Sequence, residues 1–242
     1  MVRIMNKSVP KDLILRCANS FYQELKDDAH GRYRSWEYCY TAFCDAREQP
    51  DPDDDYLSLM LAFYLASWGM YRGSSFLLQK DYKIHIPVVK ELLKDKYDCL
   101  VGANCEELKK EETRKLIFDD LNHFMKKYYD PIRRTISEKD LNNDLSDTLI
   151  TKILMGTLAC VPAYDRYFIS GITEYKVSTR NYNEKSLLKL IAFYEENYDD
   201  FEAARKKMKV GERSYPQMKM LDMSFWKIGF DLDNKKGLKK SH

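Results

Sequence analysis

Few residues of this chain favour turns or irregular backbone. Its 242 residues include only nine glycines and seven prolines. Both residue types are concentrated in the tight turns of strand-rich folds, so their scarcity argues against a β-sandwich or barrel. The longest apolar run, Tyr56–Met70, contains Ser58 and Ser67 and is too short to span a bilayer comfortably. We therefore expect a helical protein that has no membrane partner.

The cysteines and histidines lack the spacing of metal ligands. No Cys-x-x-Cys pair occurs and no histidine lies at ligand distance along the chain from a cysteine, so zinc is not expected. The first residues have no long apolar core of a secretion signal, which favours free thiols and a cytoplasmic location. The cysteines are Cys17, Cys39, Cys44, Cys99, Cys105 and Cys160.

The chain has almost no excess of charge of either sign. Its 40 basic and 38 acidic residues leave a net charge of +2, which argues against a histone-like nucleic-acid binder but is compatible with a local basic face. Two basic segments, Arg205–Lys209 and Lys235–Lys240, could contact a DNA backbone, although solvated surface is the simpler expectation. Phosphate-binding loops, a hydrolase nucleophile elbow and a zinc-protease signature are all missing.

Helical spacing of apolar residues recurs along the whole chain. It predicts an all-α protein of about nine or ten helices in a compact bundle, with two lobes, 1–130 and 131–230, as a further possibility that would create a cleft. Residues 231–242 are polar and basic, and we expect them to form a disordered tail. The segment Tyr56–Met70 is hydrophobic nearly all round, which predicts a central helix surrounded by others.

One lysine and one aspartate stand out in the apolar segment Leu149–Phe168. Lys152 lies in a nearly apolar helix, and Gly156, one turn later, leaves room for a ligand or another backbone. A desolvated lysine has a lowered pKa and can act as a nucleophile. Asp165 follows Pro162 at a predicted helix start. Spacing alone favours a structural alternative, in which Asp165 is a helix cap and Lys152 reaches solvent.

A second cluster of chemically useful residues lies in the segment Trp68–Phe76. Trp68 and Tyr71 could stack on a nucleobase, and Arg72, between two glycines, could bind a phosphate. The alternative is a buried break between helices in which Arg72 pairs with a carboxylate.

The segment Leu149–Phe168 resembles the catalytic region of the helix-hairpin-helix DNA glycosylases. In that superfamily an aspartate opens a helix just after a hairpin, and bifunctional members carry an upstream lysine that attacks the sugar. The glycine-rich hairpin of the family is absent here. The residues that carry the resemblance are Lys152, Val161, Pro162, Asp165 and Phe168.

The resemblance implies an enzyme that flips a damaged or modified base out of double-stranded DNA and removes it, in repair or against invading DNA, without a metal or cofactor. Asp165 would stabilise the sugar cation or activate water, and Lys152 would alternatively attack C1′ and form a Schiff base. Both side chains should then face one concave, partly basic pocket, within about 10 Å of each other. The alternatives are a non-enzymatic helical interaction protein of a defence or mobile-element locus and a nucleic-acid-binding module. The predicted substrate-binding residues are Trp68, Tyr71, Arg72, Tyr164 and Arg166.

Overall fold

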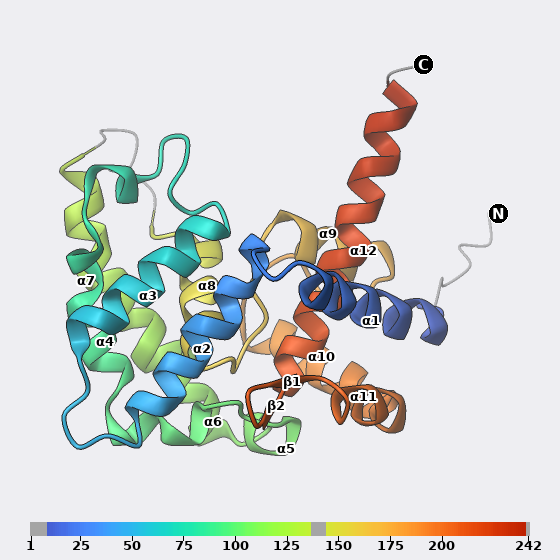
Figure 1. Ribbon diagram of the computed structural model, residues 1–242, viewed down its shortest axis with the longest axis horizontal. Helices are drawn as coiled ribbons and strands as arrows, with labels where there is room; N and C mark the ends of the chain where they lie inside the picture. The colour runs from blue at the N-terminus through green and yellow to red at the C-terminus, as the bar shows by residue number, and fades with distance from the viewer. Residues whose placement is uncertain (1–8, 137–143, 241–242) are drawn as a thin grey trace.

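The chain folds into an all-α protein (Figure 1). The computed structural model describes residues 9–136 and 144–240. Within these ranges the α-helices are α1 (Lys11–Asp27), α2 (Ser35–Ala46), α3 (Asp54–Ser67), α4 (Ile86–Leu92), α5 (Cys105–Leu108), α6 (Glu111–Lys115), α7 (Asn122–Arg134), α8 (Asp147–Thr157), α9 (Arg166–Glu174), α10 (Glu184–Glu196), α11 (Tyr198–Arg205) and α12 (Gln217–Lys240). Shorter helical turns are η1 (Arg32–Arg34), η2 (Phe76–Gln79), η3 (Tyr82–His85), η4 (Asp95–Leu100) and the π-helical η5 (Leu116–Leu121). Strands β1 (Lys209–Val210) and β2 (Arg213–Ser214) form an antiparallel pair.

The helices form two groups that lie side by side in Figure 1. One group contains α2 to α8, and the other contains α1 together with α9 to α12. Helix α1 packs against α12, although the two lie near opposite ends of the chain. Their contact buries one face of α1, on which Ile14, Cys17, Phe21 and Leu25 follow helical spacing. The two groups are therefore not consecutive halves of the sequence.

Helix α12 is longer than the sequence suggested. Its first half is buried in the core, and its last turns project away from the other helices (Figure 1). The helix continues through Lys240, past residue 231 where the sequence predicted that a disordered tail begins; residues 241–242 lie outside the described residues. Phe230 and Leu232 still pack against the core, and no proline interrupts the residues that follow.

Helices α9 and α12 cross with their backbones in contact. A Cβ atom at Gly171 of α9 would lie 2.1 Å from the carbonyl oxygen of Phe225, and one at Gly229 of α12 would lie 1.9 Å from that of Tyr167. Only glycine permits such an approach from both sides. The crossing brings the first turn of α9 against the middle of α12, where Trp226 lies.

Helix α3 is not surrounded by other helices, contrary to the sequence expectation. Tyr56, Leu59 and Phe63 are each about half exposed, at 51%, 48% and 51%. The opposite side of α3 packs against α2, α4 and α8. Hydrophobic residues on every side of a helix show what it is able to bury, whereas its position at the edge of the group decides what it does bury. No helix in the described part of the chain has both the length and the apolar character needed to cross a membrane.

Candidate functional site

The loop between α8 and α9 is held by side chains of α8. Two threonines one turn apart bind the same residue: the Thr151 hydroxyl accepts the Tyr164 N–H at 2.8 Å, and the Thr148 hydroxyl donates to the Tyr164 carbonyl at 2.9 Å. Ala159, at the beginning of the loop, has a positive φ of 51°, a left-handed conformation that is costly for a residue with a Cβ atom. The backbone that leads to Asp165 is thus fixed by its own preceding helix.

Helix α12 holds the same loop from the other side. Asp222 accepts the backbone N–H of Ala163 at 2.9 Å through one carboxylate oxygen, and its other oxygen accepts from Lys219 at 2.8 Å. The Ala163 carbonyl then accepts the Asp165 N–H at 2.8 Å. Both Lys219 and Asp222 are almost fully buried. Asp165 is therefore positioned by a charged pair that lies in the core behind it.

Asp165 uses both of its carboxylate oxygens. Oδ1 accepts the backbone N–H groups of Tyr167 and Phe168, each at 3.0 Å, and so caps α9. Oδ2 accepts from Nζ of Lys152 at 3.0 Å. The predicted cap is present, but Lys152 does not extend into solvent, because its side chain is only 3% exposed and that of Asp165 is 15% exposed.

Lys152 reaches Asp165 across the face of an indole. Its Nζ atom lies 4.9 Å from the ring centre of Trp68, a cation–π distance. Gly156 does not provide the space for a ligand that the sequence suggested. A Cβ atom there would lie 2.4 Å from the ring of Tyr64, so the glycine makes room for a core tyrosine instead.

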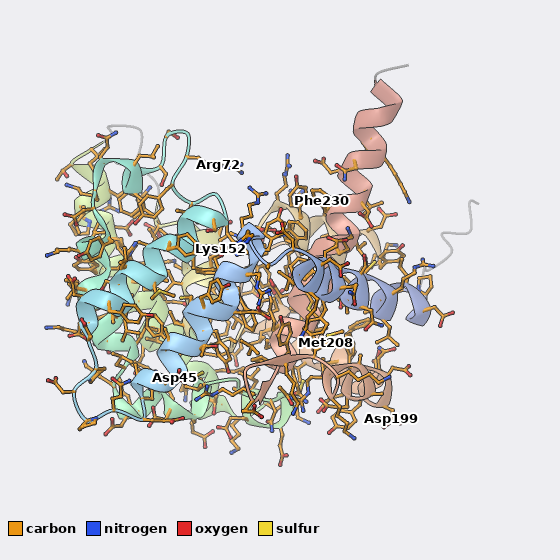
Figure 2. The ribbon with its side chains drawn as sticks, in the orientation of Figure 1. Asp45, Arg72, Lys152, Asp199, Met208 and Phe230 are labelled. Carbon is orange, nitrogen blue, oxygen red and sulfur yellow. The ribbon has the colours of Figure 1, made fainter. Side chains whose placement is uncertain are left out.

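Lys152 and Asp165 both line a pocket of about 330 Å³. Four cationic side chains and one carboxylate face it, which makes it basic. The residues come from η1, the end of α3 and the loop after it, α8, α9 and α12; Figure 2 labels Lys152, Arg72 and Phe230 from three of these segments. The lining residues are Arg32, Tyr33, Ser67, Trp68, Gly69, Met70, Arg72, Thr148, Lys152, Asp165, Arg166, Tyr167, Trp226 and Phe230.

Trp226 of α12 is the centre of the aromatic wall of this pocket. Its ring centre lies 5.4 Å from Tyr33, 5.8 Å from Trp68 and 5.3 Å from Tyr167, all nearly edge to face. Phe230 stacks on it at 5.1 Å. The indole nitrogen of Trp68 is buried and has no hydrogen-bond partner among the described residues.

A second lysine lies under the same aromatic wall. Nζ of Lys219 is 4.7 Å from the ring centre of Trp36 and 5.4 Å from that of Trp68. Trp68 therefore contacts the ammonium groups of both buried lysine–aspartate pairs. The sequence analysis missed Lys219 and Asp222, although a lysine and an aspartate three residues apart in an otherwise apolar helix are a visible signal.

Two of the residues predicted to bind substrate lie elsewhere. Tyr164 is 1% exposed and its hydroxyl is hydrogen bonded to Ser186 at 2.6 Å, so its ring belongs to the core and not to the pocket. Tyr71 does not line the pocket either; its hydroxyl bonds to Nε2 of His85 at 2.8 Å. Trp68, Arg72 and Arg166, predicted with them, do line it.

His85 and Cys160 are both held by burial in their uncharged forms, so neither is a candidate base or nucleophile at ordinary pH. His85 lies between Tyr71 and Tyr129, and burial lowers its pKa to about 3, so it is neutral at ordinary pH. Burial raises the pKa of Cys160 to about 12, so its thiol stays protonated. No group of three or more potential metal ligands occurs among residues 9–136 and 144–240.

A larger hollow, of about 630 Å³, lies between α1, α2, α3 and the β1–β2 hairpin. Its charges nearly balance, because three basic side chains and two carboxylates line it. The ion pair among them, Arg34 with Glu37, is longer, at 3.6 Å, and its cation is less buried, at 28% exposed, than in the pair of Lys152 and Asp165. The smaller basic pocket therefore has the more distinctive chemistry. The chain matches no protein-family model, no curated protein and no solved structure, so evidence for a function comes from the geometry of this pocket.

Proposed function

We propose that this chain is a DNA glycosylase-like enzyme whose basic aromatic pocket accepts a nucleobase flipped out of double-stranded DNA. The observation that carries the proposal is the buried pair of Lys152 and Asp165, with Nζ and Oδ2 3.0 Å apart, which faces a pocket walled by aromatic rings. An ionisable pair in such a pocket is where acid, base or nucleophilic chemistry is expected.

The size and lining of the pocket support a nucleobase as the occupant. A volume of about 330 Å³ is at the small end of the range of ligand pockets, which extends from about 300 to 1,000 Å³. Bases removed from the helical stack are held between aromatic side chains, and Tyr33, Trp68 and Tyr167 line the cavity.

In the hydrolytic route, Asp165 acts on the sugar of the flipped nucleotide. The C1′–N bond breaks and its electron pair stays with the departing base, which leaves positive charge on the sugar. The Asp165 carboxylate stabilises this cation. A water molecule then adds to C1′, its proton passes to the carboxylate, and the departed base is protonated in turn. One water is consumed and an abasic site remains.

In the alternative route, Lys152 is the nucleophile. Its ammonium first gives a proton to Asp165 across the 3.0 Å hydrogen bond, and the neutral amine attacks C1′ as the base leaves. The base anion takes up that proton. Opening of the sugar ring converts the adduct into a Schiff base, which borohydride reduces to a stable covalent link.

The test is incubation with duplexes that carry varied damaged or modified bases, followed by alkali cleavage and borohydride trapping. We expect abasic sites from the wild-type chain and none from Asp165→Asn, while Asp147→Asn, an exposed carboxylate outside the pocket, stays active. Trapped product that disappears in Lys152→Gln would assign the lysine route. If no duplex yields abasic sites, the enzymatic proposal is wrong.

A base-binding module without catalysis is the second candidate. It is favoured by the fact that both oxygens of Asp165 already have partners, two backbone N–H groups and Lys152. Such a module would shift the mobility of DNA in a salt-sensitive way and release no base. The same set of duplexes therefore distinguishes the two functions.

A further inference from the structure

Two Arg-Tyr dipeptides with the same internal geometry lie at the pocket. The guanidinium of Arg32 is stacked 4.7 Å from the ring centre of Tyr33 and donates to its hydroxyl at 2.7 Å. The guanidinium of Arg166 is stacked 4.5 Å from the ring centre of Tyr167 and donates to its hydroxyl at 2.6 Å. In both cases the arginine is exposed and the tyrosine is half-buried.

The tyrosines of both dipeptides pack against the same core residue. Tyr33 from η1 and Tyr167 from α9 contact the indole of Trp226 at 5.4 and 5.3 Å. Tyr33 also contacts Trp68, whereas Tyr167 also contacts Phe230. The two tyrosines therefore flank Trp226 in the aromatic wall, and each has an exposed guanidinium stacked on it at the rim of the pocket.

Among the described residues, the arginines at the pocket have either no carboxylate partner or an exposed one. Arg32 and Arg72 form no ion pair with a carboxylate in the described part of the chain. Arg166 pairs with Asp233 at 3.2 Å, but the two side chains are 70% and 49% exposed, and such surface pairs contribute little to stability. Stacking on a tyrosine fixes the direction of each guanidinium without neutralising it, which suits a role in binding an anion.

We propose that Arg32 and Arg166 bind the backbone phosphates on the two sides of the nucleotide whose base enters the pocket, with Arg72 as a third contact. This inference rests on the proposed function. A guanidinium presents N–H donors in a planar fork that matches a phosphodiester. Because the tyrosines pre-orient the forks, little side-chain freedom is lost on binding. The aromatic rings of the pocket then contact the base, and the exposed arginines at its rim contact the phosphates of the strand.

The test measures binding to a fluorescent duplex that contains one tetrahydrofuran abasic analogue, at a series of KCl concentrations. Each lost phosphate contact should reduce the slope of log K against log salt by about 0.9. We expect that reduction for Arg32→Gln and for Arg166→Gln, and about twice the reduction for the double variant. Arg180→Gln, an exposed arginine outside the pocket, is the matched control and should keep the wild-type slope.

Two further variants should change the affinity for the duplex in opposite directions. Asp233→Asn removes the carboxylate that competes for Arg166 and should tighten binding. Arg32→Lys keeps the charge but not the fork, so it should keep the slope while binding more weakly. Circular dichroism checks that each variant is folded.

If the rim variants follow the Arg180 control while the wild type binds DNA and produces abasic sites, the phosphate clamp is wrong and the proposed function stands. If the wild type binds no duplex at all, both are wrong.

Discussion

The ion pair between Lys152 and Asp165 makes a quantitative prediction about stability. In Asp165→Asn, the amide oxygen can still accept the two N–H groups that cap α9, but Lys152 loses its counter-charge. Because that side chain is 3% exposed, its ammonium would be buried without a partner, which costs about 3–5 kcal/mol when one member of a buried pair is removed.

The opposite change, Lys152→Met, should cost less. It leaves a carboxylate that is partly exposed and still accepts two backbone N–H groups at a helix N-terminus, where negative charge is favoured. The double variant Lys152→Met with Asp165→Asn buries no charge. We therefore expect it to be more stable than Asp165→Asn alone by at least about 2 kcal/mol.

Urea unfolding followed by circular dichroism measures these differences, provided that the dependence of unfolding free energy on urea is unchanged. A matched control is the exposed pair of Lys115 and Glu111, which is 2.7 Å apart but 61% and 68% exposed; its double-mutant cycle should give less than about 0.5 kcal/mol. If the Lys152–Asp165 cycle gives no more than this control, the pair is not desolvated and the reasoning fails. Loss of stability in Asp165→Asn would not argue against catalysis, since the same carboxylate caps a helix and faces the pocket.

The remaining predictions concern the packing that supports the site. Gly229→Ala should destabilise the protein by at least about 2 kcal/mol in thermal unfolding, because its Cβ atom would lie 1.9 Å from the carbonyl oxygen of Tyr167. Gly211→Ala, whose Cβ meets nothing within 4 Å but whose φ is +57°, should lose only the cost of a left-handed alanine, and a loss no larger than this for Gly229→Ala would contradict the close helix crossing. Burial lowers the pKa of His85 to about 3, whereas the unfolded chain binds this proton near pH 6.5. Stability should therefore fall as the pH drops from about 6.5 to 3, by up to about 1.4 kcal/mol per pH unit, and urea unfolding of His85→Gln should lack this part of the slope; equal slopes would contradict a buried neutral histidine.

Local sequence signals located the helices and the segment of the site that carries Lys152 and Asp165. Asp165 was recognisable as a helix cap, and its side chain accepts backbone N–H groups of the first turn of α9. Such caps depend only on residues a few positions apart. For the same reason the segment that carries Lys152 and Asp165 could be singled out before its surroundings were known.

Other features depended on contacts between distant segments. Gly156 and Tyr164 seemed suited to a ligand site, yet one accommodates the ring of Tyr64 and the other is buried with Ser186. Tyr71 seemed suited to stack on a base, yet it is tied to His85. In each case the residue type was compatible with both roles, and only the partner across the core decided between them.

The sequence by itself determined the all-α class, the helix starts and the segment that holds an ionisable pair, because these follow from spacing within a few turns of chain. The tertiary structure alone decided that Lys152 and Asp165 meet, that Trp226 and Arg32 belong to the same pocket, and that Lys219 lies behind it. Helical spacing specifies which face each helix can bury. It does not specify which faces pack against each other, and the pocket forms only where those particular faces come together.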